Sequence, residues 1–301
     1  MIYFYKVYGL NVESELLVPE LSPLDKSEQN NIDVKISFGS MPRDIKELIN
    51  RGIKANYQKQ RMWFHIKDIA SYCISNGNEI TIELCEITDP QIVKVYILGS
   101  VLGMVLLQRD IVAIHGGSIV INGKGCIFTG DKGAGKSTLT TALRKKGYDF
   151  VSDDVASIKI DKTNMIYPGF GYQKLCEDAM IKLGYNPSEF EPFRSDMNIK
   201  YMVPALDSFV DSEVQLEALF ELEVGDVERV GLVEIKGNEK LQKLMKNIFR
   251  VEIIPYVGGM TSIYLKKCID IAKSIKCYKI IRPKDMFTVD EQVKLVEELV
   301  G

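Results

Sequence analysis

The fold of this chain is decided by the stretch Gly130-Asp131-Lys132-Gly133-Ala134-Gly135-Lys136-Ser137. It matches the pattern G-x-x-x-x-G-K-[ST], in which the backbone N–H groups of a glycine-rich turn surround phosphate oxygens. An apolar run at residues 126–129 enters the turn as a β-strand would, and a helical pattern over residues 137–146 leaves it. The start of such a helix directs the positive end of its dipole to the same anion. A plain glycine-rich turn is the alternative, but the flanking strand and helix favour a nucleotide-binding loop.

The turn supplies the candidate residues for binding ATP and Mg²⁺. Lys136 is expected to reach the β- and γ-phosphates, and the Ser137 hydroxyl is expected to ligate Mg²⁺. The candidate cofactor-binding residues are Gly130, Asp131, Lys132, Gly133, Ala134, Gly135, Lys136, Ser137 and Thr138.

Two adjacent carboxylates, Asp153 and Asp154, follow the strand expected at residues 148–151. A carboxylate at the end of a neighbouring strand is where a P-loop protein places its second Mg²⁺ contact. Two carboxylates in a row can divide the work, since one holds the metal while the other accepts a proton from an incoming hydroxyl. An isolated Asp-Asp pair is more often a solvated acidic turn, but its place after the P-loop helix favours a site.

His115 ends another apolar run, at residues 111–114. Beside a carboxylate, its ring can tune the proton affinity of that group or orient a phosphoryl oxygen. A histidine that ends a strand can equally be a structural residue with satisfied hydrogen bonds. The spacing of the sequence leaves both interpretations open.

Length and composition exclude several classes of protein. The chain has 301 residues, of which 46% are hydrophobic and 26% are charged, and its formal net charge is −3. These values are ordinary for globular domains and exclude disordered, collagen-like and coiled-coil chains. The small negative charge offers no basic surface for nucleic acid or for an anionic membrane, so neither is expected as a partner. A homo-oligomer is left open.

Cysteine spacing and apolar runs indicate the compartment. None of the six cysteines forms a C-x-x-C pair and the two histidines lie far apart, so neither a zinc site nor a disulfide framework is expected. The thiols are expected to be reduced and mostly buried. No secretory signal is visible, and the longest apolar run, residues 95–107, is shorter than the ~20 residues of a membrane span. The sequence therefore predicts a cytoplasmic protein.

The succession of short strands and helices predicts an α/β fold in two parts. Residues 1–105 are expected to form a smaller N-terminal α+β module, and residues 106–301 the catalytic domain. Either the N-terminal module or residues 167–201 would bind the acceptor. Residues 90–108 are predicted to be a buried helix that Asp89 can cap. Strands are expected at residues 2–8, 34–38, 63–66, 80–85, 111–114, 118–121, 126–129, 148–151, 155–160, 165–167 and 214–224. Helices are expected at residues 137–146, 239–249 and 289–300, and Asn122-Gly123 predicts a hairpin turn.

These elements resemble the catalytic domain of HPr kinase/phosphorylase, a bacterial P-loop serine kinase that shares its fold with phosphoenolpyruvate carboxykinase. The resemblance rests on His115-Gly116, the loop at residues 130–137 and Asp153-Asp154, in the same order and at matching spacing, and it is dense over about residues 111–161. It implies that Asp153 is the base acting on a serine hydroxyl, that Asp154 lies at the metal and that His115 supports the base. The candidate catalytic residues are therefore Asp153, His115 and Lys136, and the candidate metal ligands are Ser137 and Asp154.

The chain departs from that family at two places. Lys132 stands where the family has a serine, and we expect it to face solvent. The proline-glycine-arginine-asparagine loop associated with the reverse, phosphorolytic reaction is not evident, and the nearest segment, residues 255–259, has no arginine. The resemblance therefore does not imply the reverse reaction for this chain.

A second resemblance is to HPr-kinase-like proteins encoded with ribosomal peptide maturation systems, notably lasso peptide kinases. It rests on Tyr5-Lys6-Val7-Tyr8-Gly9-Leu10, Ser14-Glu15 and Pro19-Glu20-Leu21. It implies a serine on a precursor peptide as the acceptor. The leading hypothesis is therefore an ATP-dependent serine kinase acting on a peptide or small protein.

Two alternatives to this hypothesis stay open. The first is a small-molecule kinase on the same fold, because the sequence contains no acceptor-binding signature that excludes it. The second is a nucleotide-binding sensor or assembly factor without transfer activity. Asp153-Asp154 together with His115 argue against the second alternative, because binding alone needs no base.

Overall fold

The computed structural model describes residues 1–86, 88, 90–160, 162–195 and 198–300, so the expected helix cap Asp89 lies outside the described residues. The chain divides into two compact units, Met1–Ile111 with Arg250–Tyr264, and Val112–Phe249 with Leu265–Gly301. This division differs from the expected one because the first unit extends beyond residue 105 and a late segment returns to it. The returning segment is held by contacts that no local pattern encodes, such as the Thr261 hydroxyl that donates to Asp110 over 3.0 Å.

The first unit contains an eight-stranded sheet in the order β3-β1-β2-β4-β8-β7-β6-β5. β4 pairs in parallel with β2 and with β8, and the other neighbours are antiparallel. The strands are β1 Tyr3–Val7, β2 Leu10–Ser14, β3 Ser22–Pro23, β4 Val34–Phe38, β5 Ala55–Tyr57, β6 Arg61–Ile66, β7 Ala70–Ser75 and β8 Glu79–Leu84. The strands expected at residues 2–8, 34–38, 63–66 and 80–85 are thus confirmed to within two residues at each end, and α1 is a helix over Arg43–Asn50.

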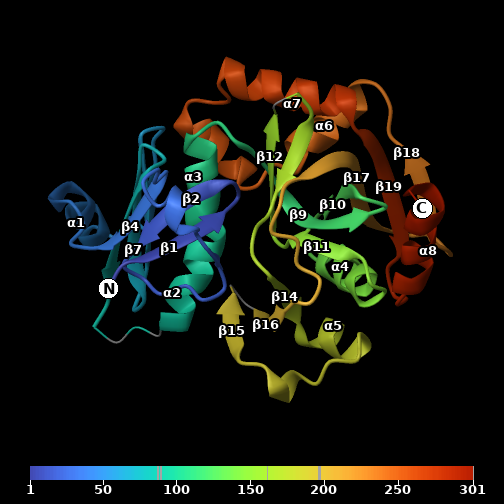
Figure 1. The fold of residues 1–301 in the computed structure, drawn as a ribbon, viewed down its shortest axis with the longest axis horizontal. Coiled ribbons are helices and arrows are strands. Elements are labelled where there is room, and N and C mark those ends of the chain that lie inside the picture. Colours follow the sequence, from blue (N-terminus) through green and yellow to red (C-terminus); the bar gives the residue numbers. More distant parts are fainter. Residues whose placement is uncertain (87, 89, 161, 196–197, 301) are drawn as a thin grey trace. The chain divides into compact units, whose positions relative to one another are not determined.

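The helix expected at residues 90–108 is present as α2 Pro90–Tyr96, a π-helical turn Ile97–Val101 and α3 Leu102–Gln108. Figure 1 shows α2 and α3 in line beside the strands of the first unit. Every residue of the π-helical turn is buried, which follows from a run with so few polar side chains. In the described part of the chain, no helix combines the length and the apolar character that crossing a membrane requires.

The second unit is built on a second sheet, in the order β10-β9-β12-β13-β17-β19-β18, with β11 paired to β9. β10 also pairs with β17, so β10, β9, β12, β13 and β17 form a closed circuit of pairings. β10, β17 and β19 are parallel, which brings their carboxyl ends to one edge of the sheet. The strands are β9 Val112–Ile121, β10 Lys124–Gly130, β11 Asp149–Ser152, β12 Val155–Ile160, β13 Asn164–Tyr167, β17 Val214–Gly225, β18 Gly231–Glu234 and β19 Lys276–Pro283.

Two of the expected strands, residues 111–114 and 118–121, are one continuous strand, β9. The prediction broke this strand at Gly116 and Gly117, but glycine is required there because a Cβ at Gly116 would lie 2.3 Å from the carbonyl oxygen of Phe128. The hairpin predicted at Asn122-Gly123 is confirmed, since both residues have positive φ, 50° and 74°, and join β9 to β10.

The second unit also contains helices. They are α4 Lys136–Lys145, α5 Glu177–Lys182, α6 Asn238–Lys246, α7 Ser262–Ser274, which begins in the first unit, and α8 Val289–Val300. Buried apolar side chains of α4 and α8 share one core with Phe128 of β10 and Phe220 of β17, whose rings stack at 5.1 Å. The helix expected at residues 239–249 ends earlier, at Lys246, because the following residues run back to β9, where Ile248 bridges to Ile114.

A separate three-stranded sheet of the second unit was not predicted. It has the order β14-β16-β15, formed by β14 Tyr172–Cys176, β15 Pro192–Ser195 and β16 Asn198–Pro204. Its own small core contains Leu175, Met180, Tyr201 and Val203. Charged side chains, Lys174 in β14, Arg194 in β15 and Lys200 in β16, interrupt the apolar pattern, so the sequence alone did not predict these strands.

Candidate active site

The glycine-rich turn joins the end of β10 at Gly130 to the start of α4 at Lys136. Gly130, Gly133 and Gly135 have φ values of 137°, 84° and 104°, which favour a residue without a Cβ. At Gly130, a Cβ would also lie 2.3 Å from the carbonyl oxygen of Leu222 on β17. The strand, turn and helix that the motif predicts are therefore present, with glycine where the backbone requires it.

Two basic side chains hold the carbonyl groups of this turn. Nζ of Lys136 donates to the carbonyl oxygen of Gly130 over 2.8 Å. Arg282, near the end of β19, donates from Nε to the carbonyl oxygen of Ala134 and from Nη2 to that of Gly133, each over 2.9 Å. Within the turn, the N–H of Ala134 donates to the carbonyl oxygen of Asp131 over 3.1 Å. These contacts fix the shape of the turn, whose other N–H groups can meet an anion.

Asp153 lies directly after β11 and is 3% exposed. Its Oδ1 accepts a hydrogen bond from the Ser137 hydroxyl over 3.4 Å, and its Oδ2 accepts one from the backbone N–H of Lys174 over 2.8 Å. The first bond joins the carboxylate to the first turn of α4, and the second joins it to β14. The structure thus brings Asp153 beside Ser137.

Asp154 has different neighbours. Its φ is 66°, an uncommon backbone conformation for a residue with a side chain and one that clusters at functional sites. Its Oδ2 accepts from Nζ of Lys174 over 3.1 Å, and its Oδ1 lies 3.4 Å from Nδ1 of His115. We expected Ser137 and Asp154 to hold the metal together. Of the two aspartates, however, it is Asp153 that accepts a hydrogen bond from the Ser137 hydroxyl.

His115 lies in β9, where its backbone N–H donates to the carbonyl oxygen of Asn247 over 2.8 Å. Nδ1 lies 3.2 Å from the carbonyl oxygen of Asp154, and the ring centroid lies 5.8 Å from that of Phe249. Because both neighbours of Nδ1 are acceptors, the geometry fits a ring protonated at Nδ1. The sequence left open whether His115 acts on a carboxylate or is a structural residue. The structure places its ring beside a carboxylate, as the first interpretation requires.

The two carboxyl groups have opposite pKa shifts. Burial raises the pKa of Asp153 above its ordinary value, and the negative charge of Asp154 raises it further. Burial acts in the same direction on Asp154 and is the largest single effect. The positive charges of Lys174, His115 and Lys200 and the hydrogen bond from Lys174 together outweigh it, so the pKa of Asp154 lies below its ordinary value. Burial lowers the pKa of His115, and the negative charge of Asp154 partly opposes this shift. Opposite shifts in adjacent carboxyl groups are a pattern of acid–base sites.

The side chains at this site fit a magnesium–nucleotide complex. The hydroxyl of Ser137 and the carboxylates of Asp153 and Asp154 are the hard oxygen donors that Mg²⁺ prefers. Among the described residues, no group of three or more His, Cys, Asp and Glu side chains is arranged to hold a metal. Where Mg²⁺ is bound with a nucleotide, phosphate oxygens and water usually supply much of its coordination.

The other expected binding residues differ in exposure. Asp131 and Lys132 are exposed, and the Asp131 carboxylate forms an ion pair with Lys246 over 3.2 Å. Ala134 is buried, and Thr138 is half-buried in the first turn of α4. The side chains that meet at one place are those of Ser137, Asp153, Asp154 and His115, next to the turn that Lys136 holds.

Three basic residues of the site were missed by the sequence analysis: Lys174 on β14, Lys200 on β16 and Arg282 on β19. Each lies on a strand that was not predicted. Strand pairing therefore could not be used to place it near the turn or the carboxylates. The side chain of Lys174 is 7% exposed, a burial that only the structure shows. A buried lysine implies a carboxylate partner.

Replacing Lys174 by methionine is expected to destabilise the second unit, because the Asp154 carboxylate then lacks its cation. The two side chains are 7% and 25% exposed, so we expect a loss of about 2 kcal/mol in the free energy of unfolding, below the ~3–5 kcal/mol of a fully buried pair. Urea denaturation measures this change, with Lys159→Met at an exposed position of β12 as the control. A loss no larger than that of the control would mean that the pair does not stabilise the fold.

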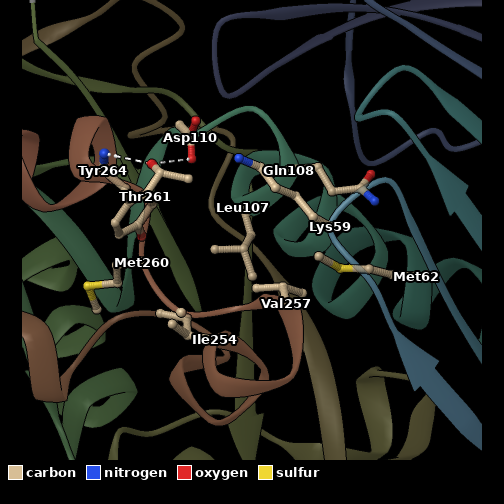
Figure 2. Close-up of a pocket in the computed structure, with 11 residues that line it drawn as sticks. Lys59, Met62, Leu107, Gln108, Asp110, Ile254, Val257, Met260, Thr261 and Tyr264 are labelled. Carbon is tan, nitrogen blue, oxygen red and sulfur yellow. Dashed lines mark hydrogen bonds between the residues drawn. The ribbon is translucent and has the colours of Figure 1, made fainter.

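A pocket lies within the first unit. Figure 2 shows its lining, which combines side chains from the end of α3, from β6 and from the returning segment. Its apolar surface is formed by Met62, Leu107, Ile254, Val257 and Met260. At one side, the hydroxyl of Thr261 donates to Asp110 and accepts from the N–H of Tyr264, each over 3.0 Å. The pocket is a mainly apolar cavity with a polar edge.

Comparison with known proteins finds distant similarity to solved structures. Neither a scan against protein-family models nor a search of curated proteins finds a match for this sequence. Among solved structures, the chain is similar to the Hpr(Ser) kinase/phosphatase from Coxiella burnetii, at 16% identity and a TM-score of 0.31, over 62% of this chain and 93% of that chain. At this identity and TM-score, the similarity is too distant to assign a fold or an activity. The mixed α/β architecture is established by the sheets and helices themselves.

Proposed function

We propose that this chain is an ATP-dependent kinase that transfers the γ-phosphoryl group of Mg·ATP to a serine hydroxyl. The observation that carries the proposal is the hydrogen bond of 3.4 Å between Ser137, in the first turn of α4, and Asp153. It joins a phosphate-binding motif to a buried carboxylate, the two parts that phosphoryl transfer to an alcohol needs. The location proposed for this reaction is the cytoplasm.

Each side chain has a role in this proposal. The turn and Lys136 bind the phosphates, while Ser137 and Asp154 hold Mg²⁺, which neutralises charge on the phosphate oxygens when bound. Asp153 accepts the proton of the acceptor hydroxyl, a role that its raised pKa suits, since a base works best with a pKa near the working pH. His115 orients the Asp154 segment through Nδ1.

The acceptor in this proposal is a serine of a peptide or small protein. The opening sequence, with its similarity to lasso peptide kinases, supports a ribosomally made precursor peptide. The pocket of the first unit offers apolar surface for a side chain of such a peptide.

The proposal predicts that the protein, incubated with γ-labelled ATP and Mg²⁺, labels serine-containing peptides and leaves free serine unlabelled. Replacement of the acceptor serine by alanine is expected to abolish labelling. Peptide and free serine are separated by chromatography, so one experiment distinguishes the two acceptors. Labelling of free serine alone would favour a small-molecule kinase. Binding of ATP without any labelled product across a panel of peptides would favour a sensor.

A further inference from the structure

Lys200 shares a face of the three-stranded sheet with Lys174. In the antiparallel register of β14 and β16, Lys200 lies opposite Cys176, two positions from Lys174 along β14. Residues paired across antiparallel strands point to the same face, and diagonal neighbours lie about 7–8 Å apart. The other face bears Leu175 and Tyr201, which belong to the small apolar core. Lys200 therefore projects on the side where Lys174 meets the carboxylate pair.

Lys200 favours the ionised forms of Asp153 and Asp154 through its charge, and not through an ion pair with either carboxylate. Lys174 forms the ion pair with Asp154, whereas Lys200 takes part in none of the ion pairs found among the described residues. The side chain is half-buried. Its positive charge helps to lower the pKa values of Lys136 and His115, and it opposes the rise in that of Asp153. Lys200 is thus within electrostatic reach of both the P-loop lysine and the proposed base.

A cation in this position has a chemical use in phosphoryl transfer. During transfer, negative charge spreads over the three equatorial oxygens of the moving group. Lys136 neutralises part of this charge from the turn, but Asp153 and Asp154 bring further negative charge to the same place. A second cation, carried by a different element, offsets that repulsion and fixes the phosphoryl group between them.

We propose that Lys200 binds the γ-phosphoryl group of the nucleotide, which makes it a catalytic residue contributed by the three-stranded sheet. This inference rests on the proposed function, because it requires a nucleotide on the P-loop. In this proposal, Lys200 contacts the terminal phosphate of ATP and not the phosphates that ADP shares with ATP.

The test compares the binding of Mg·AMP-PNP, which has a γ-phosphate, with that of Mg·ADP, which has none, by isothermal titration calorimetry. For Lys200→Ala, we expect the affinity for Mg·AMP-PNP to fall about 10- to 100-fold, the effect of losing one charge-assisted hydrogen bond. The affinity for Mg·ADP should change by less than about 3-fold, because ADP lacks the group concerned. Lys200→Arg should restore most of the loss. Lys159→Ala removes the same charge from an exposed position of β12 and should change neither affinity.

The outcomes separate this inference from the proposed function. Equal losses for both nucleotides, or no loss for either, would overturn the role of Lys200 while leaving the kinase proposal in place. Failure of the unaltered protein to bind either nucleotide would remove the proposed function, and this inference with it. A melting temperature that falls in Lys200→Ala but not in Lys200→Arg, with no difference between nucleotides, would assign Lys200 a structural role.

Discussion

Asp153→Asn is expected to reduce phosphoryl transfer about 10²- to 10⁴-fold, the usual contribution of a general base. Asparagine keeps the shape of the side chain, so its oxygen can still accept the N–H of Lys174, as Oδ2 of Asp153 does over 2.8 Å. It cannot accept a proton from an acceptor hydroxyl at neutral pH. The affinity for Mg·ATP should therefore stay within about 3-fold of the parent value, because the turn and Lys136 are unchanged. Transfer is measured with γ-labelled ATP and a peptide that the parent phosphorylates.

The matched control is Asp149→Asn, which makes the same chemical change at the exposed first residue of β11. It should retain the parent rate. Transfer by Asp153→Asn at the rate of this control would show that Asp153 is not the base. The 3.4 Å contact with Ser137 makes a third result informative. If the affinity for ATP falls only when Mg²⁺ is present, Asp153 holds the metal, and the base must be sought at Asp154.

Gly130→Ala is expected to abolish nucleotide binding and to lower the free energy of unfolding by about 3 kcal/mol, the upper range for an overpacked site. Its Cβ would lie 2.3 Å from the carbonyl oxygen of Leu222, a backbone atom of the parallel neighbour strand that cannot rotate away. The φ of 137° adds strain for any residue with a side chain. Relief of the clash requires β10 and β17 to separate where the turn begins, which displaces the N–H groups of the turn.

Gly133→Ala is the control within the same motif. Gly133 also has a positive φ, 84°, but a Cβ there would meet nothing within 4 Å. Its cost should be about 1 kcal/mol, from the backbone conformation alone. Urea denaturation and nucleotide titration of both variants measure the difference. Equal stability and equal nucleotide affinity of the two variants would show that the close approach of β10 and β17 does not shape the turn.

Parts of this molecule that depend on neighbouring residues were predictable from the sequence. The strand, turn and α4 around Gly130 and Lys136 follow from glycine positions and from the hydrophobic pattern of a few consecutive residues. The hairpin at Asn122-Gly123 and the helix at Val289–Val300 are local in the same sense. The prediction failed in β9, where Gly116 was interpreted as a break because the reason for that glycine, the carbonyl of Phe128, lies on another strand.

The sequence by itself determined the phosphate-binding motif, the adjacent carboxylates and the mixed α/β class, because each is written in contiguous residues. Only the tertiary structure decided which groups surround the carboxylates. Ser137 reaches Asp153 and Lys174 reaches Asp154 through the packing of α4, β11 and β14, and Arg282 meets the turn from more than a hundred residues away. Such contacts arise from strand order and register, and these are set by the burial of whole strands and not by any short run of side chains.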